Sequence, residues 1–383
     1  MARMSYATLR DTLTFEDKLD ELRLSLKYIM GNTYTSLSTH DPNDLLVGRD
    51  RQPMKKSATF GGSTLPLLRP AIHSDSITAL AVVRPGMVIT GSRDKTLALN
   101  NVDTGECVTK WTGHDGEVTK LAYENTVGNH FVLSGSRDQS IKLWQFHSRE
   151  AQRTFEGHSL GVTGLANINE NSFVSGSRDT TLKIWDVEST KRSVRSAQVN
   201  RNLVTHITFS LPCNIIAQSS EDKEVKLWDP RNLELVAQLP RKNHIQMYCE
   251  FIDDKLLASS SNGFNGYGCE ISIWDIRTRK LLRELRGHEG SVPCVAGLTQ
   301  QVTLKKLLMS VSMDRSIRIW NIEDGVCVWE ETVVTDSDLL QCVSFNDGHV
   351  VVSGGKGVLA HIRVQGRAGK PYFQMLSVQK MIS

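Results

Sequence analysis

The chain has 383 residues, of which 39% are hydrophobic and 23% charged, and its formal net charge is +3. This is an ordinary soluble globular composition, and the near balance of charge gives no argument for nucleic-acid binding. The sequence has no apolar run of about 18 residues and no signal-peptide h-region, so neither a transmembrane helix nor secretion is expected. The seven scattered cysteines favour buried free thiols in a reducing, cytoplasmic setting over disulfides or a zinc site.

Residues 1–63 precede the repetitive part of the chain and are expected to form an extension. Apolar residues at helical spacing predict an amphipathic helix over about residues 14–30, and the polar, turn-rich residues that follow predict a flexible linker. The helix would bind a partner, form a short coiled coil or fold back on the rest of the chain, and the pattern does not separate these roles. The apolar stripe consists of Phe15, Leu19, Leu22, Leu26 and Ile29.

The segment MGNTYT, from Met30 to Thr35, matches the MGxxxT pattern for N-myristoylation. The match is inert in a chain that begins at Met1, because Gly31 is then internal. A form that began at Met30 would expose Gly31 to acylation, and the basic pair Lys55 and Lys56 would assist anchoring. A lipid anchor is therefore expected only if such a shorter form exists.

Residues 64–383 are repetitive. Each repeat reads as four short strands, with alternating and β-branched runs separated by Gly, Asp or Asn turns. A period of about 40 to 46 residues with GH and WD marks is typical of a β-propeller with one four-stranded blade per repeat. The chain thus resembles WD-repeat proteins over about residues 65–370. The repeating tryptophans are Trp144, Trp185, Trp228, Trp274 and Trp320.

Six repeats are explicit, and the degenerate run Leu339 to Val364 is assigned as a seventh. The prediction is an all-β, seven-bladed WD-repeat propeller that carries a short N-terminal helical or disordered extension. One blade is expected to combine both ends of the chain. The sequence favours the N-terminal run Thr64 to Pro70 as the outer strand of blade 7, and Tyr372 to Val378 competes for that place.

The resemblance implies a hydrogen-bonded set of His, Ser or Thr, Asp and Trp in each blade, which ties two strands to the loop that leads into the blade. Blade 1 has Asn100 in place of Trp, blade 4 has Asn200 in place of His, and blade 5 retains only Trp274. The complete sets are expected in blades 2, 3 and 6: His114, Ser136, Asp138 and Trp144; His158, Ser177, Asp179 and Trp185; His288, Ser312, Asp314 and Trp320.

Because this Ser, His and Asp trio recurs once per blade, it is interpreted as structural and not as a hydrolase site. The sequence shows no other catalytic constellation, no metal-ligand spacing and no cofactor motif. The protein is therefore expected to be a non-enzymatic scaffold for protein partners, without a metal or cofactor.

Two groups of residues are candidates for partner binding at the mouth of the propeller. In the family, the residue before the turn Asp faces this mouth, and here three adjacent blades place Arg there, with Arg201 extending the arc. Such arginines suit carboxylates or phosphates, so acidic or phosphorylated segments are expected partners; the alternative is a rim that only solubilises the protein. The arc consists of Arg93, Arg137, Arg178 and Arg201.

Blade 5 has about five extra residues of Gly, Asn and aromatics before its WD dipeptide, in the run SSSNGFNGYGCEISIWD. Phe264 and Tyr267 lie at its centre. They form either an aromatic recognition loop beside the basic arc or a plug folded into the channel. The WDxR runs that end at Arg231 and Arg277 offer a different surface, because some WD-repeat substrate receptors use this pattern to dock on a cullin–RING ubiquitin ligase.

The middle of the chain is similar to the WD repeat-containing protein 31 family. The similarity rests on RNLVTHITF, SSEDKEVKLWD, HIQMYCE and SNGFNGYGCEISIWD, which span blades 4 and 5. This resemblance implies a non-catalytic regulator of intraflagellar transport that acts beside small-GTPase regulators at the ciliary base. A substrate receptor of a cullin–RING ligase is the alternative function.

Overall fold

The computed structural model describes residues 65–126, 129–189, 193–199, 202–298, 305–333, 337–367 and 370–381. The predicted extension, its helix and the acylation segment at Gly31 lie outside these ranges, as do Asn200 and Arg201. No helix in the described part of the chain is long and apolar enough to cross a membrane.

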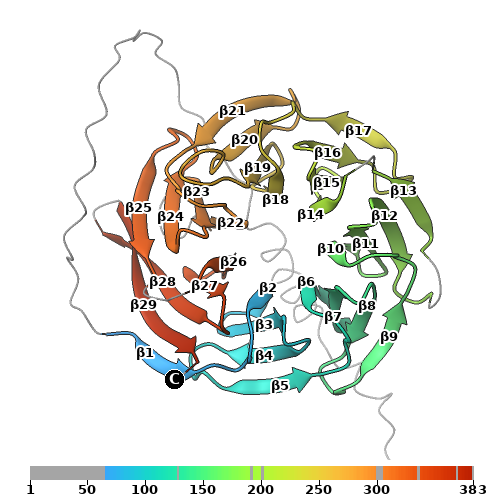
Figure 1. The fold of residues 1–383 in the computed structure, drawn as a ribbon, viewed down its shortest axis with the longest axis horizontal. Coiled ribbons are helices and arrows are strands. Elements are labelled where there is room, and N and C mark those ends of the chain that lie inside the picture. Colours follow the sequence, from blue (N-terminus) through green and yellow to red (C-terminus); the bar gives the residue numbers. More distant parts are fainter. Residues whose placement is uncertain are drawn as a thin grey trace, which may run out of the picture. The chain divides into compact units, whose positions relative to one another are not determined.

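The described residues form a ring of seven antiparallel blades, as the repeat predicts (Figure 1). The first strand of each blade lies nearest the centre and the last lies outside. Blades 1 to 3 consist of β2 Ile77–Arg84, β3 Met87–Ser92, β4 Leu97–Asn101 and β5 Cys107–Trp111; β6 Val118–Thr126, β7 Asn129–Ser136, β8 Ile141–Trp144 and β9 Ala151–Phe155; β10 Val162–Asn169, β11 Ser172–Ser177, β12 Thr181–Asp186 and β13 Arg195–Gln198.

Blades 4 to 6 repeat this order, with one sheet per blade. Their strands are β14 Val204–Ser210, β15 Ile215–Ser220, β16 Val225–Trp228 and β17 Leu235–Gln238; β18 Gln246–Phe251, β19 Leu256–Ser261, β20 Ile271–Asp275 and β21 Lys280–Leu285; β22 Cys294–Leu298, β23 Leu307–Val311, β24 Ser316–Asn321 and β25 Cys327–Thr332.

Blade 7 closes the ring with strands from both ends of the chain. Its sheet has five strands in the order β1-β29-β28-β27-β26, and β1 is parallel to β29. The sequence favoured the N-terminal run as the outer strand, and β1 is the outermost strand of this sheet, but the competing C-terminal run, β29, takes the fourth place inside it. Both runs find partners because β29 has two edges. The strands are β1 Leu67–Pro70, β26 Leu339–Ser344, β27 His349–Gly354, β28 Leu359–Arg367 and β29 Lys370–Lys380.

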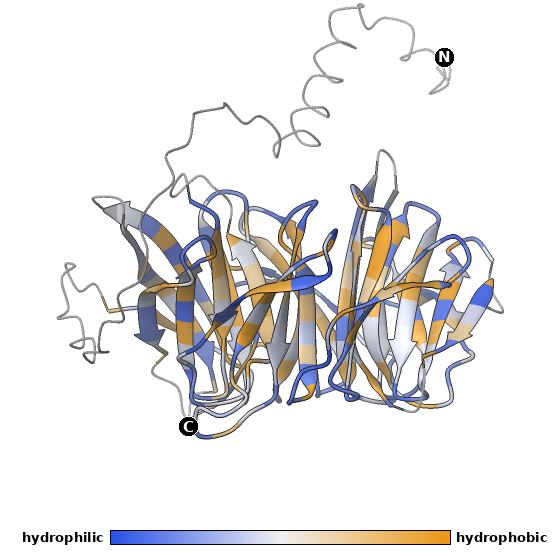
Figure 2. Cartoon of the chain, turned by 90° about the horizontal axis from the view of Figure 1, so that it is seen from above, coloured by the Kyte–Doolittle hydropathy of each residue, from blue (hydrophilic) through white to orange (hydrophobic). Residues whose placement is uncertain are grey.

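The hydrophobic core lies between neighbouring blades. Trp144 of blade 2, for example, packs with Ile89 and Trp111 of blade 1. The glycine of each SGS run allows this close packing, because a Cβ at Gly135 would lie 2.6 Å from Val162 of the next blade. Figure 2 shows apolar residues in the strands and hydrophilic residues in the loops at the two faces.

Candidate functional site

Blades 2, 3 and 6 share a buried hydrogen-bonded set that fixes each blade. In blade 3, Ser175 Oγ lies 2.7 Å from His158 Nε2 and accepts a hydrogen bond of 2.7 Å from Trp185 Nε1. The other imidazole nitrogen, His158 Nδ1, lies 2.8 Å from Asp179. The histidine, aspartate and tryptophan of this set are therefore the residues that the sequence predicted. Blades 2 and 6 repeat the arrangement through Ser134 and Ser310.

The serines of these sets are corrected by the structure. The sequence assigned Ser136, Ser177 and Ser312, but the serine that joins His to Trp lies two residues earlier in each blade. Side chains two residues apart share one face of a strand and lie about 7 Å apart, so the sequence pattern does not distinguish them. The later serine instead closes the turn: Ser177 Oγ accepts a hydrogen bond of 3.1 Å from Asp179 N.

The aspartates of these sets are fully bonded. Asp138 accepts hydrogen bonds from His114, from Asp115 N and from both the backbone and the hydroxyl of Ser140. Burial raises the pKa of Asp138, but the bonds from His114 and Ser140 outweigh burial and hold it well below its usual range. The polar groups of this set are thus paired with one another or with the backbone, and Ser134 is fully buried. This geometry agrees with a structural role.

Blades 1 and 4 build the same junction from other residues. In blade 1, Thr90 takes the serine position, and Asn100 Nδ2 donates to its hydroxyl at 2.8 Å. In blade 4, Trp228 Nε1 donates to Gln218 at 3.1 Å. The buried Lys226 ammonium, with 1% of its side chain exposed, pairs with Asp222 at 2.8 Å and so replaces the histidine.

Blade 5 also retains part of the set, contrary to the sequence prediction that only Trp274 remains. Trp274 Nε1 donates to Ser259 Oγ at 2.9 Å, and Ser259 in turn donates to Gln246 Oε1 at 2.8 Å. Gln246 on the inner strand therefore takes the place of the histidine. Lys242, which precedes this strand, pairs with Glu284. The extra loop residues separate Ser259 from Trp274 by more residues than in the other blades, so the sequence pattern did not align Ser259 with their junction serines.

The extra residues form a defined turn, termed here the blade 5 loop (residues 262–269). Phe264 and Tyr267 exchange backbone hydrogen bonds of 2.9 and 3.1 Å across Asn265 and Gly266, whose φ values are +51° and +78°. Positive φ at both central residues is the geometry of a type I′ hairpin turn, which Asn-Gly favours. The backbone of this loop is therefore held in one conformation.

The blade 5 loop is also docked on blade 6. Gly266 N donates to Glu289 O at 3.1 Å, and Ser291 Oγ donates to Gly263 O at 3.0 Å. The rings stay outside: Phe264 is 76% exposed and Tyr267 is 80% exposed. These exposures disagree with a plug folded into the channel.

Side chains of the inner strands occupy the channel instead. The Lys120 ammonium of blade 2 lies 5.2 Å from the ring centre of Tyr248 in blade 5, three blades away, and the Tyr248 and His206 rings are 3.7 Å apart. Burial lowers the pKa of Lys120 to about 8 and raises that of Glu250 to about 8. These residues were not predicted from the sequence, because no local pattern marks a contact across the ring.

The basic arc lies on one rim of the propeller. Its position is fixed by a backbone bond that every blade repeats, from Arg93 N to Ser76 O, Arg137 N to Glu117 O and Arg178 N to Gly161 O, for example. Arg93 and Arg137 share Glu117, at 3.9 and 3.2 Å. Arg178 is exposed. Part of the arc is therefore neutralised, as the alternative of a solubilising rim expects.

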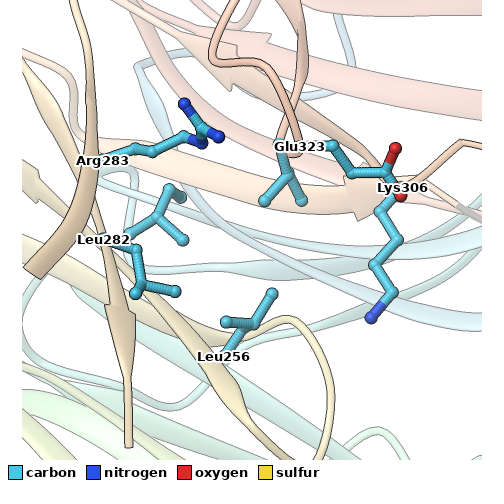
Figure 3. A pocket seen from close by; sticks show the side chains of 7 residues that line it. Leu256, Leu282, Arg283, Lys306 and Glu323 are labelled. Carbon is cyan, nitrogen blue, oxygen red and sulfur yellow. The ribbon is translucent and has the colours of Figure 1, made fainter. Parts of the chain in front are cut away.

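The WDxR arginines are exposed in turns that follow the third strands of blades 4 and 5. Arg231 binds Asp229 of its own WD dipeptide at 2.6 Å, and Arg277 lies 3.3 Å from Asp254. A groove of about 400 Å³ lies between blades 5 and 6. Leu282 and Arg283 line one side of this groove and Lys306 the other (Figure 3).

The comparisons with known proteins identify the class. The family model "WD domain, G-beta repeat" matches residues 105–145, 149–186 and 279–321. A crystal structure of the WD40 beta propeller domain of Doa1 is similar with a TM-score of 0.65 at 24% identity, covering 76% of this chain and 93% of that one. The chain carries WD40 repeats and folds as a WD40 β-propeller, a fold that is typically non-catalytic.

In sequence, the chain is similar to nuclear distribution protein nudF of Aspergillus niger, with 31% identity over 43% of this chain and 36% of that protein. It is also similar to periodic tryptophan protein 2 of Saccharomyces cerevisiae, with 33% identity over 32% of this chain and 12% of that protein. The match thus spans about a third of the nudF relative and a smaller part of the yeast one.

Proposed function

We propose that this propeller is a non-catalytic scaffold that recruits a protein partner through the blade 5 loop. The observation that carries the proposal is the pair of aromatic rings, Phe264 and Tyr267, exposed on a backbone that is already fixed. Aromatic side chains dominate many interfaces, and a preorganised loop loses little conformational freedom on binding. Met313, which is 39% exposed on blade 6, follows the loop on which this turn is docked and extends the apolar surface.

The charge of the rim favours a partner with an acidic or phosphorylated segment. Arg178 is exposed, while Arg93 and Arg137 are partly neutralised by their shared Glu117. A partner anchored on the aromatics would reach these arginines across the mouth, where a carboxylate or phosphate accepts bidentate hydrogen bonds from Arg. Arg178 is the residue on which this contact most depends.

The test compares proteins captured by the tagged full chain with those captured by matched variants. Phe264→Ala with Tyr267→Ala should remove the aromatic-dependent partner, and Arg137→Glu with Arg178→Glu should remove any acidic one. Val108→Ala, an exposed residue on the outer strand of blade 1, is the control and should change nothing. Retention of every partner by both double variants contradicts the proposal.

The cellular setting is proposed from resemblance. Similarity to the WD repeat-containing protein 31 family supports a role in ciliary, intraflagellar-transport trafficking beside small-GTPase regulators. The name of the Aspergillus relative instead supports a role in nuclear distribution. A tagged protein concentrated at the ciliary base supports the first setting, whereas a signal confined to the nuclear surroundings of ciliated cells contradicts it.

A second function, substrate reception for a cullin–RING ligase, is supported by the exposure of Arg231 and Arg277. Both arginines, however, are engaged by acidic neighbours, Asp229 and Asp254. Co-purification of the ligase adaptor that is lost on Arg231→Ala with Arg277→Ala supports this function. The Phe264→Ala and Tyr267→Ala variant should leave that interaction intact, so the two functions are separable.

A further inference from the structure

Three side chains with metal-ligating atoms meet at the seam where the ring closes. His349 on β27 and His361 on β28 lie on the face of blade 7 that meets blade 1, and Asp103 comes from the turn between β4 and β5. Ligand atoms of the three residues all lie within 4.8 Å of one another. In the part of the chain that the structure describes, no second group of three such residues is as close.

The contacts leave one position in this cluster without a partner. His349 Nδ1 and His361 Nε2 are 2.8 Å apart, so a single N–H joins the two rings. His361 is 3% exposed, and its Nδ1 is buried with no hydrogen-bond partner; the carboxylate oxygen Asp103 Oδ1 lies 3.8 Å from it.

Both tautomers of His361 are unfavourable without a further group. If its Nε2 carries the proton, a bare lone pair on Nδ1 faces the Asp103 carboxylate. If its Nδ1 carries the proton, this buried donor has no acceptor at hydrogen-bond distance, because Asp103 Oδ1 lies 3.8 Å away. A cation bound between Nδ1 and the carboxylate satisfies both atoms.

We propose that Asp103, His349 and His361 bind one divalent transition-metal ion, with Zn²⁺ as the best fit. Imidazole and carboxylate are ligands of Zn²⁺, and bond lengths of about 2.0–2.1 Å place tetrahedral ligand atoms about 3.3 Å apart. Small movements of exposed groups reach this spacing, because the Asp103 side chain is 63% exposed. Water completes the fourth position. Each neutral imidazole binds through one nitrogen and keeps its proton on the other, so His361 would bind through Nδ1 while its Nε2 keeps the proton.

The surroundings hold these ligands in place. Arg69 of β1 donates to the backbone carbonyls of Val102 and Asp103, at 3.1 and 2.6 Å, and so fixes the turn that carries the carboxylate. Asp347 accepts the backbone N–H of His349 at 3.0 Å. The metal would link blade 7 to blade 1. In the described residues of blade 7, Val352 and Ile362 occupy the positions that serine and tryptophan take in blade 2.

The experiment uses the full chain, freed of metal with a chelator, and Zn²⁺ alone as the probe. Calorimetry should show one equivalent bound, and the thermal midpoint should rise with Zn²⁺. Asp103→Asn and His349→Asn, at positions that are not fully buried, should each weaken binding about tenfold or more. His147→Asn, an exposed histidine of blade 2, is the matched control and should bind as the wild type.

Cobalt separates this site from the seven cysteines. Co²⁺ should give visible bands of a tetrahedral or five-coordinate N/O site, without a thiolate charge-transfer band in the near ultraviolet. Weak Zn²⁺ binding that Asp103→Asn and His349→Asn leave unchanged, no binding at all, or a thiolate band lost with cysteine substitution would each overturn the proposal. Circular dichroism of both variants ensures that lost binding is not lost folding.

Discussion

Blades 3 and 5 show two ways to secure the same hairpin. In blade 3 a serine joins the imidazole to the indole, and an ionised Asp179 holds the tight turn. In blade 5 the serine and indole remain, a neutral Gln246 replaces the imidazole, and the turn Asp is absent. The longer loop is held instead by Ser291 of the neighbouring blade. Without the turn aspartate, the hairpin can carry a loop that presents aromatic side chains.

The largest effect should follow removal of the junction serine in blade 3. Ser175→Ala leaves Trp185 Nε1 and His158 Nε2 buried without partners, so the free energy of unfolding should fall by about 3 kcal/mol. Ser177→Ala removes bonds to the carbonyls of Leu160 and Gly161, but Leu160 is exposed and the Gly161 carbonyl keeps its bond from Arg178 N. This change should therefore cost only about 1 kcal/mol. Urea unfolding measures both variants, and equal losses would contradict the assignment of Ser175.

The corresponding change in blade 5 should cost less. Ser259→Ala leaves Trp274 Nε1 and Gln246 Oε1 unpaired, but neither group is bonded to an ionised aspartate as in blade 3. The free energy of unfolding should therefore fall by about 2 kcal/mol. Ser261→Ala, whose hydroxyl is 3.2 Å from Gln246 Nε2, is the control and should cost about 1 kcal/mol or less. If Ser259→Ala leaves the free energy of unfolding unchanged, the contact with Gln246 does not contribute to stability in place of the histidine.

Acid should weaken blade 3 through its aspartate, and blade 5 has no equivalent group. Burial raises the pKa of Asp179, but bonds from His158 and Thr181 lower it well below the unfolded value near 4. A depressed carboxyl pKa stabilises the fold above the unfolded pKa, and the stabilisation is lost as pH falls through the folded one. Between pH 6 and pH 3, the wild type should lose about 1 kcal/mol more than Asp179→Asn. Parallel pH profiles would contradict this.

The sequence predicted the seven blades because tryptophan, aspartate and glycine positions are set locally by strand and turn geometry. It did not distinguish Ser134 from Ser136, since both face the same side of one strand. Gln246 was missed because the long loop shifted the apparent alignment of blade 5. The group formed by Asp103, His349 and His361 could not be predicted, because residues that only ring closure brings together show no regular spacing in the sequence.

Loosening the blade 5 loop from blade 6 should affect binding more than stability. Ser291→Ala removes hydrogen bonds to Asn262 and Gly263 but no proposed partner contact. We expect a loss of about 1 kcal/mol in the free energy of unfolding and several-fold weaker partner binding, because the free loop then samples other conformations. Binding by calorimetry with the captured partner measures this, and unchanged affinity would show that preorganisation of the loop is unimportant.

The smallest effect on stability should accompany the largest effect on binding. Phe264 and Tyr267 are mostly exposed, so replacing both with Ala should change the free energy of unfolding by less than about 0.5 kcal/mol. If the rings anchor a partner, the same variant should lose at least about 2 kcal/mol of binding, a thirtyfold rise in Kd. A substantial loss of stability would mean that the rings serve the fold, and the contrast between blades 3 and 5 would then concern only how a hairpin is held.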